Sequence, residues 1–508
     1  MRTVRDFIKD GLMLTVTALT LRTAGVYFSA RLSIMAGEAV MGLYTQIMSV
    51  YAFAVTAASA GINLASTRII SECYGSRSYE KLDCALRSCI KYCFKAGLIV
   101  AALMFFSAPF TGNILLRDAR TVPSLRALAF ALPFISVSNA FHGYFSGIRR
   151  IPPSAATSLF EQFIRIFATI LALTFCKTAD VQTLCLVLVI CNASSEALSC
   201  FILSAFYMHY RKKFPCGNHD ISKIKKRFLG ITIPIAVSAL IRSALTTSEH
   251  ILIPIGLRAY GLDSEKALAE YGIVSGMVLP ILLYPMALLT SFASITIAEL
   301  SARVSAGDSK SSIRVTVEKG LTFAVIYGIG AAAVIGCFSD SLALAVYRNR
   351  EAGEFLRILA PLIFFMYLDH ISDGMLKGLD KQNYVMKVNI IDAALSVVFA
   401  AVLIPKFGIY GFVASLYVCE FFNCLCSFGR LFVLVKPRLS ILLTFFIPIA
   451  SALIAVHLSC YISNLRVYST VSLIMLAMGV YIILLKITGA LRIFEKKPVI
   501  TAERSPSV

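Results

Sequence analysis

Long apolar stretches separated by short charged segments run through almost the entire chain. Each stretch reaches the roughly 20 residues that an α-helix needs to cross a hydrocarbon layer about 30 Å thick. None shows the alternation of lipid-facing and lumen-facing residues that is typical of β-barrel strands. The pattern therefore predicts an all-α polytopic membrane protein with about fourteen transmembrane helices. The predicted spans are 10–30, 40–67, 92–114, 122–147, 154–176, 181–208, 228–256, 271–302, 316–338, 355–379, 384–404, 409–433, 439–462 and 468–490.

Composition and charge support this prediction. Apolar residues make up 58% of the chain and the mean hydropathy is +0.79, whereas ordinary soluble domains are about 45–50% apolar. The net charge of +20 does not indicate a nucleic-acid partner, because the basic residues concentrate on the side of the membrane that holds both termini. By the positive-inside rule this side is cytoplasmic. We expect a multi-pass protein of the bacterial plasma membrane with both termini in the cytoplasm and no nucleic-acid partner.

One segment of the chain is repeated. Residues 143–166 align without a gap with residues 374–397, so that Gly143 meets Gly374 and Glu161 meets Asp392. Two homologous lobes with an even number of spans enter the membrane from the same side, and a central cavity is expected between them. Both repeats carry two glycines four residues apart, a spacing that allows close helix packing in lipid.

The repeat predicts two pseudo-symmetric six-helix lobes followed by two additional helices. The predicted boundaries are an N-terminal lobe at 1–208, a basic cytoplasmic linker at 209–227, a C-terminal lobe at 228–433, and two additional helices with a cytoplasmic tail at 434–508.

Three arginines lie well away from the ends of predicted spans, at a depth where a charge costs roughly 2.5–3.5 kcal/mol. Arg165 follows Glu161 by one helical turn, so the two can neutralise each other; a role in the transport pathway is the alternative. Arg22 and Arg242 have no carboxylate within four residues on their own helices. A guanidinium binds phosphate with two parallel hydrogen bonds. The candidate substrate-binding residues are therefore Arg22, Arg242, Arg165 and Glu161.

A second group of polar residues suggests ion coupling. Asp369, Asp373 and Lys377 recur every four residues, with His370 beside them, and Glu249 and His250 form another pair. Carboxylates and histidines near one another can exchange protons or hold Na⁺. The alternative is a cytoplasmic helix end at headgroup level, which would explain Lys377 and Asp373.

The chain shows none of the familiar sequence patterns for an enzyme or a bound cofactor. It has no P-loop and no metal-binding His or Cys spacing, and its 14 cysteines are interpreted as small buried hydrophobic residues. We therefore expect no enzyme activity, metal or cofactor, and any work must come from H⁺, Na⁺ or the membrane potential.

Several stretches carry a family resemblance. FHGYFSGIRRIPPSAATSLFEQFIRI and LIPKFGIYGFVASL resemble stage V sporulation protein B-type polysaccharide exporters of the multidrug/oligosaccharidyl-lipid/polysaccharide (MOP) flippase superfamily, which includes lipid II flippases and MATE drug extruders. The resemblance implies alternation between inward-open and outward-open states. It also implies a groove for a lipid tail at the two additional helices.

These observations together favour a flippase for an anionic lipid-linked oligosaccharide or peptidoglycan precursor, with its pyrophosphate at Arg22 and Arg242. The expected partners are the lipid-linked sugar and membrane lipids, and a monomer is favoured. The alternatives are a MATE-type cation-coupled drug antiporter and a membrane scaffold without transport.

Overall fold

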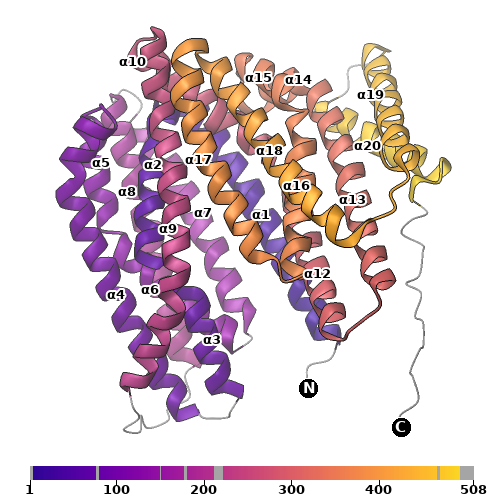
Figure 1. The fold of residues 1–508 in the computed structure, drawn as a ribbon. Helices are drawn as coiled ribbons and strands as arrows, with labels where there is room; N and C mark the ends of the chain where they lie inside the picture. Colours follow the sequence, from indigo (N-terminus) through magenta and orange to yellow (C-terminus); the bar gives the residue numbers. More distant parts are fainter. Residues whose placement is uncertain are drawn as a thin grey trace, which may run out of the picture. The chain divides into compact units, whose positions relative to one another are not determined.

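The computed structural model describes residues 4–75, 79–148, 150–176, 180–210, 221–465 and 469–491, and within these ranges every regular element is helical. Much of the predicted linker 209–227 and of the predicted tail lies outside the described residues. The helices are α1 (Val4–Ala36), α2 (Glu38–Ser59), α3 (Ile62–Gly75), α4 (Tyr79–Phe110), α5 (Thr121–Ala129), α6 (Leu132–Gly147), α7 (Ile151–Phe175), α8 (Val181–Tyr210), α9 (Ile221–Tyr260), α10 (Ser264–Tyr271), α11 (Leu279–Leu283), α12 (Met286–Ser305), α13 (Lys310–Cys337), α14 (Ser339–Tyr347), α15 (Glu351–Leu359), α16 (Leu362–Gly378), α17 (Gln382–Phe407), α18 (Ile409–Val435), α19 (Ile447–Leu465) and α20 (Thr470–Ile487), with π-helical segments at Thr111–Leu115, Gly272–Val278 and Leu442–Phe446 (Figure 1).

The number of membrane-crossing helices agrees with the predicted fold class. Twelve described segments are long and apolar enough to span a membrane, or fourteen when two bent pairs are each counted as one span. The all-α polytopic prediction is confirmed. Two details differ: the predicted span 271–302 corresponds to two segments, Ser264–Leu283 and Met286–Ser305, and the predicted first span lies in α1, which is not among the fourteen.

Local sequence explains where several helices begin and end. Gly61 separates α2 from α3 with a φ of +76°, a left-handed conformation that glycine adopts without a steric penalty. Asp263, Ser309 and Ser469 each accept a hydrogen bond from a backbone N–H in the first turn of α10, α13 and α20, which satisfies donors that have no partner inside the helix.

The chain packs as two compact units. Unit 1 contains residues 1–276 and 397–411, and unit 2 contains residues 277–396 and 412–508. Unit 1 thus includes α9 and α10, which the predicted lobe boundaries assigned to the C-terminal lobe. Packing units need not coincide with repeated units, since a helix can belong to one repeat and pack on the other. The lobe boundaries stay a prediction.

Matching contacts in the two units support the sequence repeat. In unit 1, Ser71 at the end of α3 donates to the carbonyl oxygen of Gly147 at the end of α6, at 3.2 Å. In unit 2, Ser301 in α12 donates to the carbonyl oxygen of Gly378 at the end of α16, at 3.3 Å. Both glycine-containing helices follow a short helix at a sharp bend, of 44° before α6 and 52° before α16.

The four glycines of the repeat differ in how tightly they pack. A Cβ atom on Gly143 would lie 2.6 Å from the Cβ of Ser66 and 2.7 Å from the carbonyl oxygen of Asn63, whereas the nearest atom to one on Gly374 would be the Cβ of Ala293 at 3.4 Å. The close approach of α6 to α3 therefore requires glycine at position 143.

We predict that Gly143→Ala lowers the thermal unfolding midpoint of the purified protein, since overpacking costs roughly 1–3 kcal/mol. Gly374→Ala is expected to be much milder. Gly25→Ala is the matched control, because nothing lies within 4 Å of its added Cβ. Equal midpoints for all three variants would contradict the close packing of α3 and α6.

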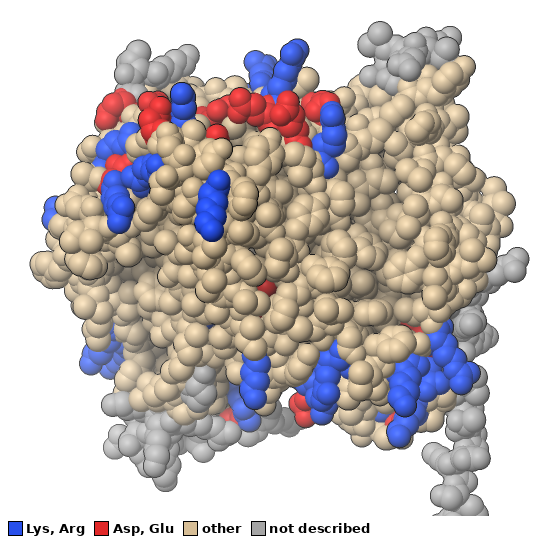
Figure 2. All heavy atoms as spheres, turned by 45° about the horizontal axis from the view of Figure 1, so that its top comes forward, with Lys and Arg blue, Asp and Glu red and all other residues tan. Residues whose placement is uncertain are grey.

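The surface between the helix ends is apolar. Figure 2 shows charged side chains mostly toward the two ends of the helices, with few of them on the face between. Large apolar side chains point outward within the spans, including Phe106 (80% exposed) and Phe175 (82% exposed). Such exposure suits contact with lipid tails, which are as apolar as the side chains themselves.

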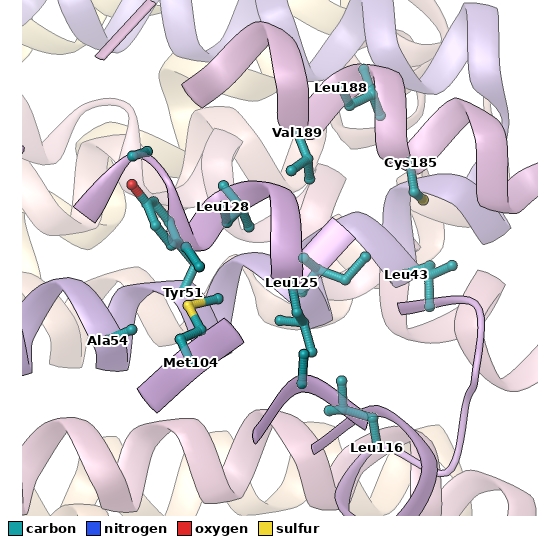
Figure 3. Packing of buried hydrophobic residues seen from close by; sticks show 14 of the residues in the cluster. Leu43, Tyr51, Ala54, Met104, Leu116, Leu125, Leu128, Cys185, Leu188 and Val189 are labelled. Carbon is teal, nitrogen blue, oxygen red and sulfur yellow. The ribbon is translucent and has the colours of Figure 1, made fainter. Parts of the chain in front are cut away.

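The interior of unit 1 contains a large apolar cluster. Figure 3 shows part of it, with Leu43 and Tyr51 from α2, Met104 from α4, Leu128 from α5 and Leu188 from α8. The Tyr51 hydroxyl points away from the labelled leucines (Figure 3) and donates a hydrogen bond to Glu196.

Candidate substrate and ion sites

Two predicted substrate-binding arginines, Arg22 in α1 and Arg242 in α9, lie in unit 1 and are exposed. Within the described part of the chain, neither guanidinium has a hydrogen bond or ion pair to another side chain. A charge that faces lipid at this depth is costly, so such residues normally face a water-filled path. The two guanidiniums are therefore available to an anion.

A third exposed arginine, Arg31 in α1, is not among the residues predicted from the sequence. α1 extends to Ala36, beyond the predicted end of the first span, and so includes Arg31. Its Nε donates to the Tyr27 hydroxyl at 3.1 Å, and its guanidinium lies 5.3 Å from the centre of the Tyr27 ring. Gly37, with a φ of +85° directly after α1, was the available signal for the true helix end.

Arg165 does not pair with Glu161 as the sequence suggested. Its guanidinium donates instead to the side-chain oxygen of Asn192 at 3.1 Å and to that of Gln162. It also lies 6.0 Å from the centre of the Phe28 ring. One turn of helix brings two side chains close but does not fix their rotamers, and the amides of Asn192 and Gln162 proved to be the better-placed acceptors.

These contacts belong to a larger network among α2, α7 and α8. Asn192 donates to one carboxylate oxygen of Glu196 at 3.0 Å, and the Tyr51 hydroxyl donates to the other. Asn192 thus links Arg165 to Glu196. Glu196 is only 7% exposed, so removing one partner would leave a buried charge without compensation, which is strongly destabilising.

The predicted ion-coupling residues of α16 occupy a buried polar cluster in unit 2. Asp373 accepts hydrogen bonds from Asn389 at 3.1 Å and Ser427 at 2.8 Å, which tie α16 to α17 and α18. Asp369, one turn earlier, is 9% exposed, and His370 beside it is half-buried. The charged neighbours of Asp369 include Asp373 and Lys377.

Asp369 and Asn423 each present a buried oxygen atom, Oδ1 in both cases, that has no hydrogen-bond donor. Acceptors of this kind are expensive to bury unless a proton or cation satisfies them. Among the described residues, no group of three or more His, Cys, Asp or Glu side chains is arranged for a metal ion. The chemistry of the cluster suits H⁺ or a hard monovalent cation.

The other predicted ion pair lies in α9 of unit 1. Nδ1 of His250 lies 2.9 Å from the hydroxyl of Tyr271, a fully buried residue at the end of α10. Glu249 is half-buried on the same helix. The His250 contact gives this residue a role in packing α9 against α10.

A family model described as polysaccharide biosynthesis protein matches residues 7–292, more than half of the chain. The chain belongs to this family. A MatE model also matches residues 255–402. The protein is a member of the MOP flippase superfamily, whose members are transporters and flippases and not enzymes.

Relatives of this polysaccharide biosynthesis family member come from Bacillus subtilis (strain 168). Stage V sporulation protein B is 22% identical over 418 residues, covering 80% of each chain. Lipid II flippase MurJ is 20% identical over 427 residues, covering 78% of this chain and 77% of the relative.

Solved structures have the same fold. A lipid II flippase MurJ structure in an inward closed conformation aligns with a TM-score of 0.70 at 13% identity, covering 96% of this chain and all of that one. An inward-facing MATE family multidrug transporter aligns with a TM-score of 0.63 at 14% identity, covering 83% of this chain and 94% of that one. Likeness at this level of identity establishes the fold and leaves the substrate to be argued from the site.

Proposed function

We propose that this MOP-superfamily transporter translocates an anionic lipid-linked oligosaccharide or peptidoglycan precursor across the bacterial plasma membrane by alternating access. The observation that carries the proposal is the pair of exposed guanidiniums, Arg22 and Arg242, inside the helices of unit 1. A pyrophosphate supplies the negative charge that two such groups require, and each planar guanidinium can donate two parallel hydrogen bonds to its oxygen atoms. The relatives named for lipid II flipping and sporulation support this substrate class.

The lipid part of the substrate would stay in the bilayer while the sugar crosses. The apolar outward-facing side chains of α19 and α20, such as Val471 (70% exposed) and Met475 (65% exposed), suit contact with a polyprenyl tail or with membrane lipids. The protein would work without an enzymatic cofactor, as a monomer, and with both termini in the cytoplasm.

The buried acceptors around Asp369 support ion coupling. When a proton or Na⁺ binds there, the uncompensated oxygens gain a partner and the helices around them pack more favourably. A transmembrane gradient of that ion would thereby bias one conformation over the other, since a ligand shifts an equilibrium by its differential affinity for the two states.

Reconstitution tests the substrate directly. Proteoliposomes are supplied with fluorescent lipid II or a polyprenyl-pyrophosphate oligosaccharide, and transfer between leaflets is followed by accessibility to an added quencher or enzyme. We expect transfer of the anionic lipid and none of a neutral glycolipid with the same tail. Efflux of organic cations without transfer of lipid-linked sugar would favour the MATE-type antiporter and overturn the proposal.

Topology provides an independent check. Reporter fusions after residues 220 and 440 should both report the cytoplasm, because basic residues concentrate in these segments. A fusion after residue 350, between α14 and α15, should report the opposite side. A reversed result at any of the three positions would contradict the proposed orientation.

A further inference from the structure

The C-terminal helix pair α19–α20 packs against α13 in unit 2 (Figure 1). Near the middle of α13, the Tyr481 hydroxyl of α20 donates to the carbonyl oxygen of Ile326 at 2.8 Å. The ring lies directly over Gly330, where a Cβ atom would come within 2.6 Å of it. The centre of α13 therefore holds α20 through a hydrogen bond and a close packing contact.

The first turns of α13 hold the segment that leads into the pair. Glu318, 7% exposed, accepts a hydrogen bond from the backbone N–H of Arg438 at 2.6 Å. Nε of Arg314 donates to the carbonyl oxygen of Val435 at 3.3 Å. The connection between α18 and α19 is thus fixed to α13 at its beginning.

Two cysteines meet at the other end of the same helices. Cys337 is the last residue of α13, Cys460 lies near the end of α19, and their sulfur atoms are 3.2 Å apart. A disulfide bond requires about 2.05 Å. Cys337 is exposed and Cys460 half-buried, so a reagent can reach the pair. Among the described free cysteines Cys337 is the only exposed one, and the others, such as Cys89 and Cys185, are buried or half-buried.

The membrane side of this pair favours oxidation, given the orientation proposed above. Both α13 and α19 begin near basic residues, Lys310 and Arg438, which belong to the cytoplasmic side by the positive-inside rule. Their other ends, with Cys337 and Cys460, then face the extracytoplasmic side, where disulfides form and persist.

We propose that Cys337 and Cys460 form a disulfide bond that fixes the added helix pair to α13 on the extracytoplasmic side. The oxidant is the disulfide of an extracytoplasmic thiol–disulfide oxidoreductase. One cysteine thiolate of this chain attacks that disulfide and forms a mixed disulfide with the oxidoreductase. The second cysteine thiolate then attacks the sulfur of the first cysteine and displaces the oxidoreductase thiolate. Two thiols of this chain lose two electrons and two protons, and the oxidoreductase is released as its dithiol.

The bond joins residues 123 positions apart in sequence. It would leave the native packing unchanged, because the beginning and the middle of α13 already hold the α19–α20 pair. α13, α19 and α20 would then move as one body during transport. The cross-link restricts the unfolded chain more than the folded one, so it stabilises the protein.

The test begins with full-length protein in cells whose free thiols are blocked with N-ethylmaleimide under denaturing conditions. After reduction, newly released thiols are counted with a maleimide mass tag. We expect the wild type to gain two more tags than the Cys337→Ser/Cys460→Ser variant. Peptides containing Cys337 and Cys460 should be linked in mass spectra and separate on reduction. Cys176→Ser, which removes a half-buried free thiol just after α7, should leave both results unchanged.

Reduction should lower the thermal unfolding midpoint of the wild type by several degrees more than that of the double variant, in which only other disulfides, such as that of Cys84, can be reduced. Equal tag counts for wild type and double variant would overturn the proposal. Transfer of lipid-linked sugar should be similar before and after reduction. Linked protein that transports only after reduction would refute movement of α13, α19 and α20 as one body. Loss of transport in both forms would count against the proposed substrate and not against the disulfide.

Discussion

Replacing Arg22 and Arg242 together with alanine is expected to abolish translocation of the anionic lipid while leaving insertion and folded yield unchanged. Each guanidinium is exposed within a helix of unit 1 and has no side-chain partner in the described residues. A charge-assisted hydrogen bond is worth about 1.5–3 kcal/mol, so loss of two phosphate contacts reduces transport roughly 100-fold or more. The measurement is the initial rate of transfer in proteoliposomes, with yield judged by size-exclusion chromatography.

Lysine substitutions and a surface control make this prediction specific. Lysine at both positions should restore transport only in part, since an ammonium supplies charge but not the two-pronged donor geometry. Arg68→Ala removes an exposed pair with Glu72 and should have little effect, because surface ion pairs contribute about 0–1 kcal/mol. If each arginine instead pairs with a carboxylate from a neighbouring helix, alanine would lower the folded yield. Normal transport by the double alanine protein would exclude the phosphate site.

The fold was predictable because the membrane imposes one strong constraint on the sequence. A buried backbone in lipid must satisfy its hydrogen bonds within the helix, so long apolar stretches could be read directly as spans. A related constraint applies to the repeated segment: Gly143, Gly147 and Gly378 occupy close helix contacts that leave little room for a larger residue. Gly37 could have indicated the end of α1. The division around Leu283 was not predictable, because it lies at Pro285 inside an apolar stretch.

Candidate site residues could be named from the sequence only where they have no partner on a neighbouring helix. Arg22 and Arg242 could be named from sequence because nothing near them on their own helices neutralises them. Asn192 could not be named as a partner of Arg165, since it lies on a different helix and the register between two helices is invisible in a single sequence. The hydrogen bonds that place Glu196 between Asn192 and Tyr51 depend on that same register.

Replacing Asp369 with asparagine is expected to abolish ion-coupled transport and to raise the thermal unfolding midpoint. Oδ1 of Asp369 is buried without a hydrogen-bond donor, and Asp373 is among its charged neighbours. Neutralising one of two neighbouring buried carboxylates removes repulsion and desolvation cost, while the same change removes the charge that would bind H⁺ or Na⁺. The measurement is the rate of lipid transfer with and without an imposed H⁺ or Na⁺ gradient, beside the melting curve of the same preparation.

Asp373→Asn provides the contrast, because Asp373 already accepts hydrogen bonds from Asn389 and Ser427. An amide nitrogen beside Asn389 would face another donor, and one beside Ser427 would require that hydroxyl to accept in place of donating, so this variant should lose folded yield and have a lower midpoint. The two substitutions delete the same charge one helical turn apart and are expected to change stability in opposite directions. If Asp369→Asn protein still responds to the gradient as the wild type does, the cluster around Asp369 is not the coupling site. If the Asp369→Asn protein instead unfolds at a lower temperature than the wild type, Asp369 has a structural partner and its buried oxygen is not an ion-binding group.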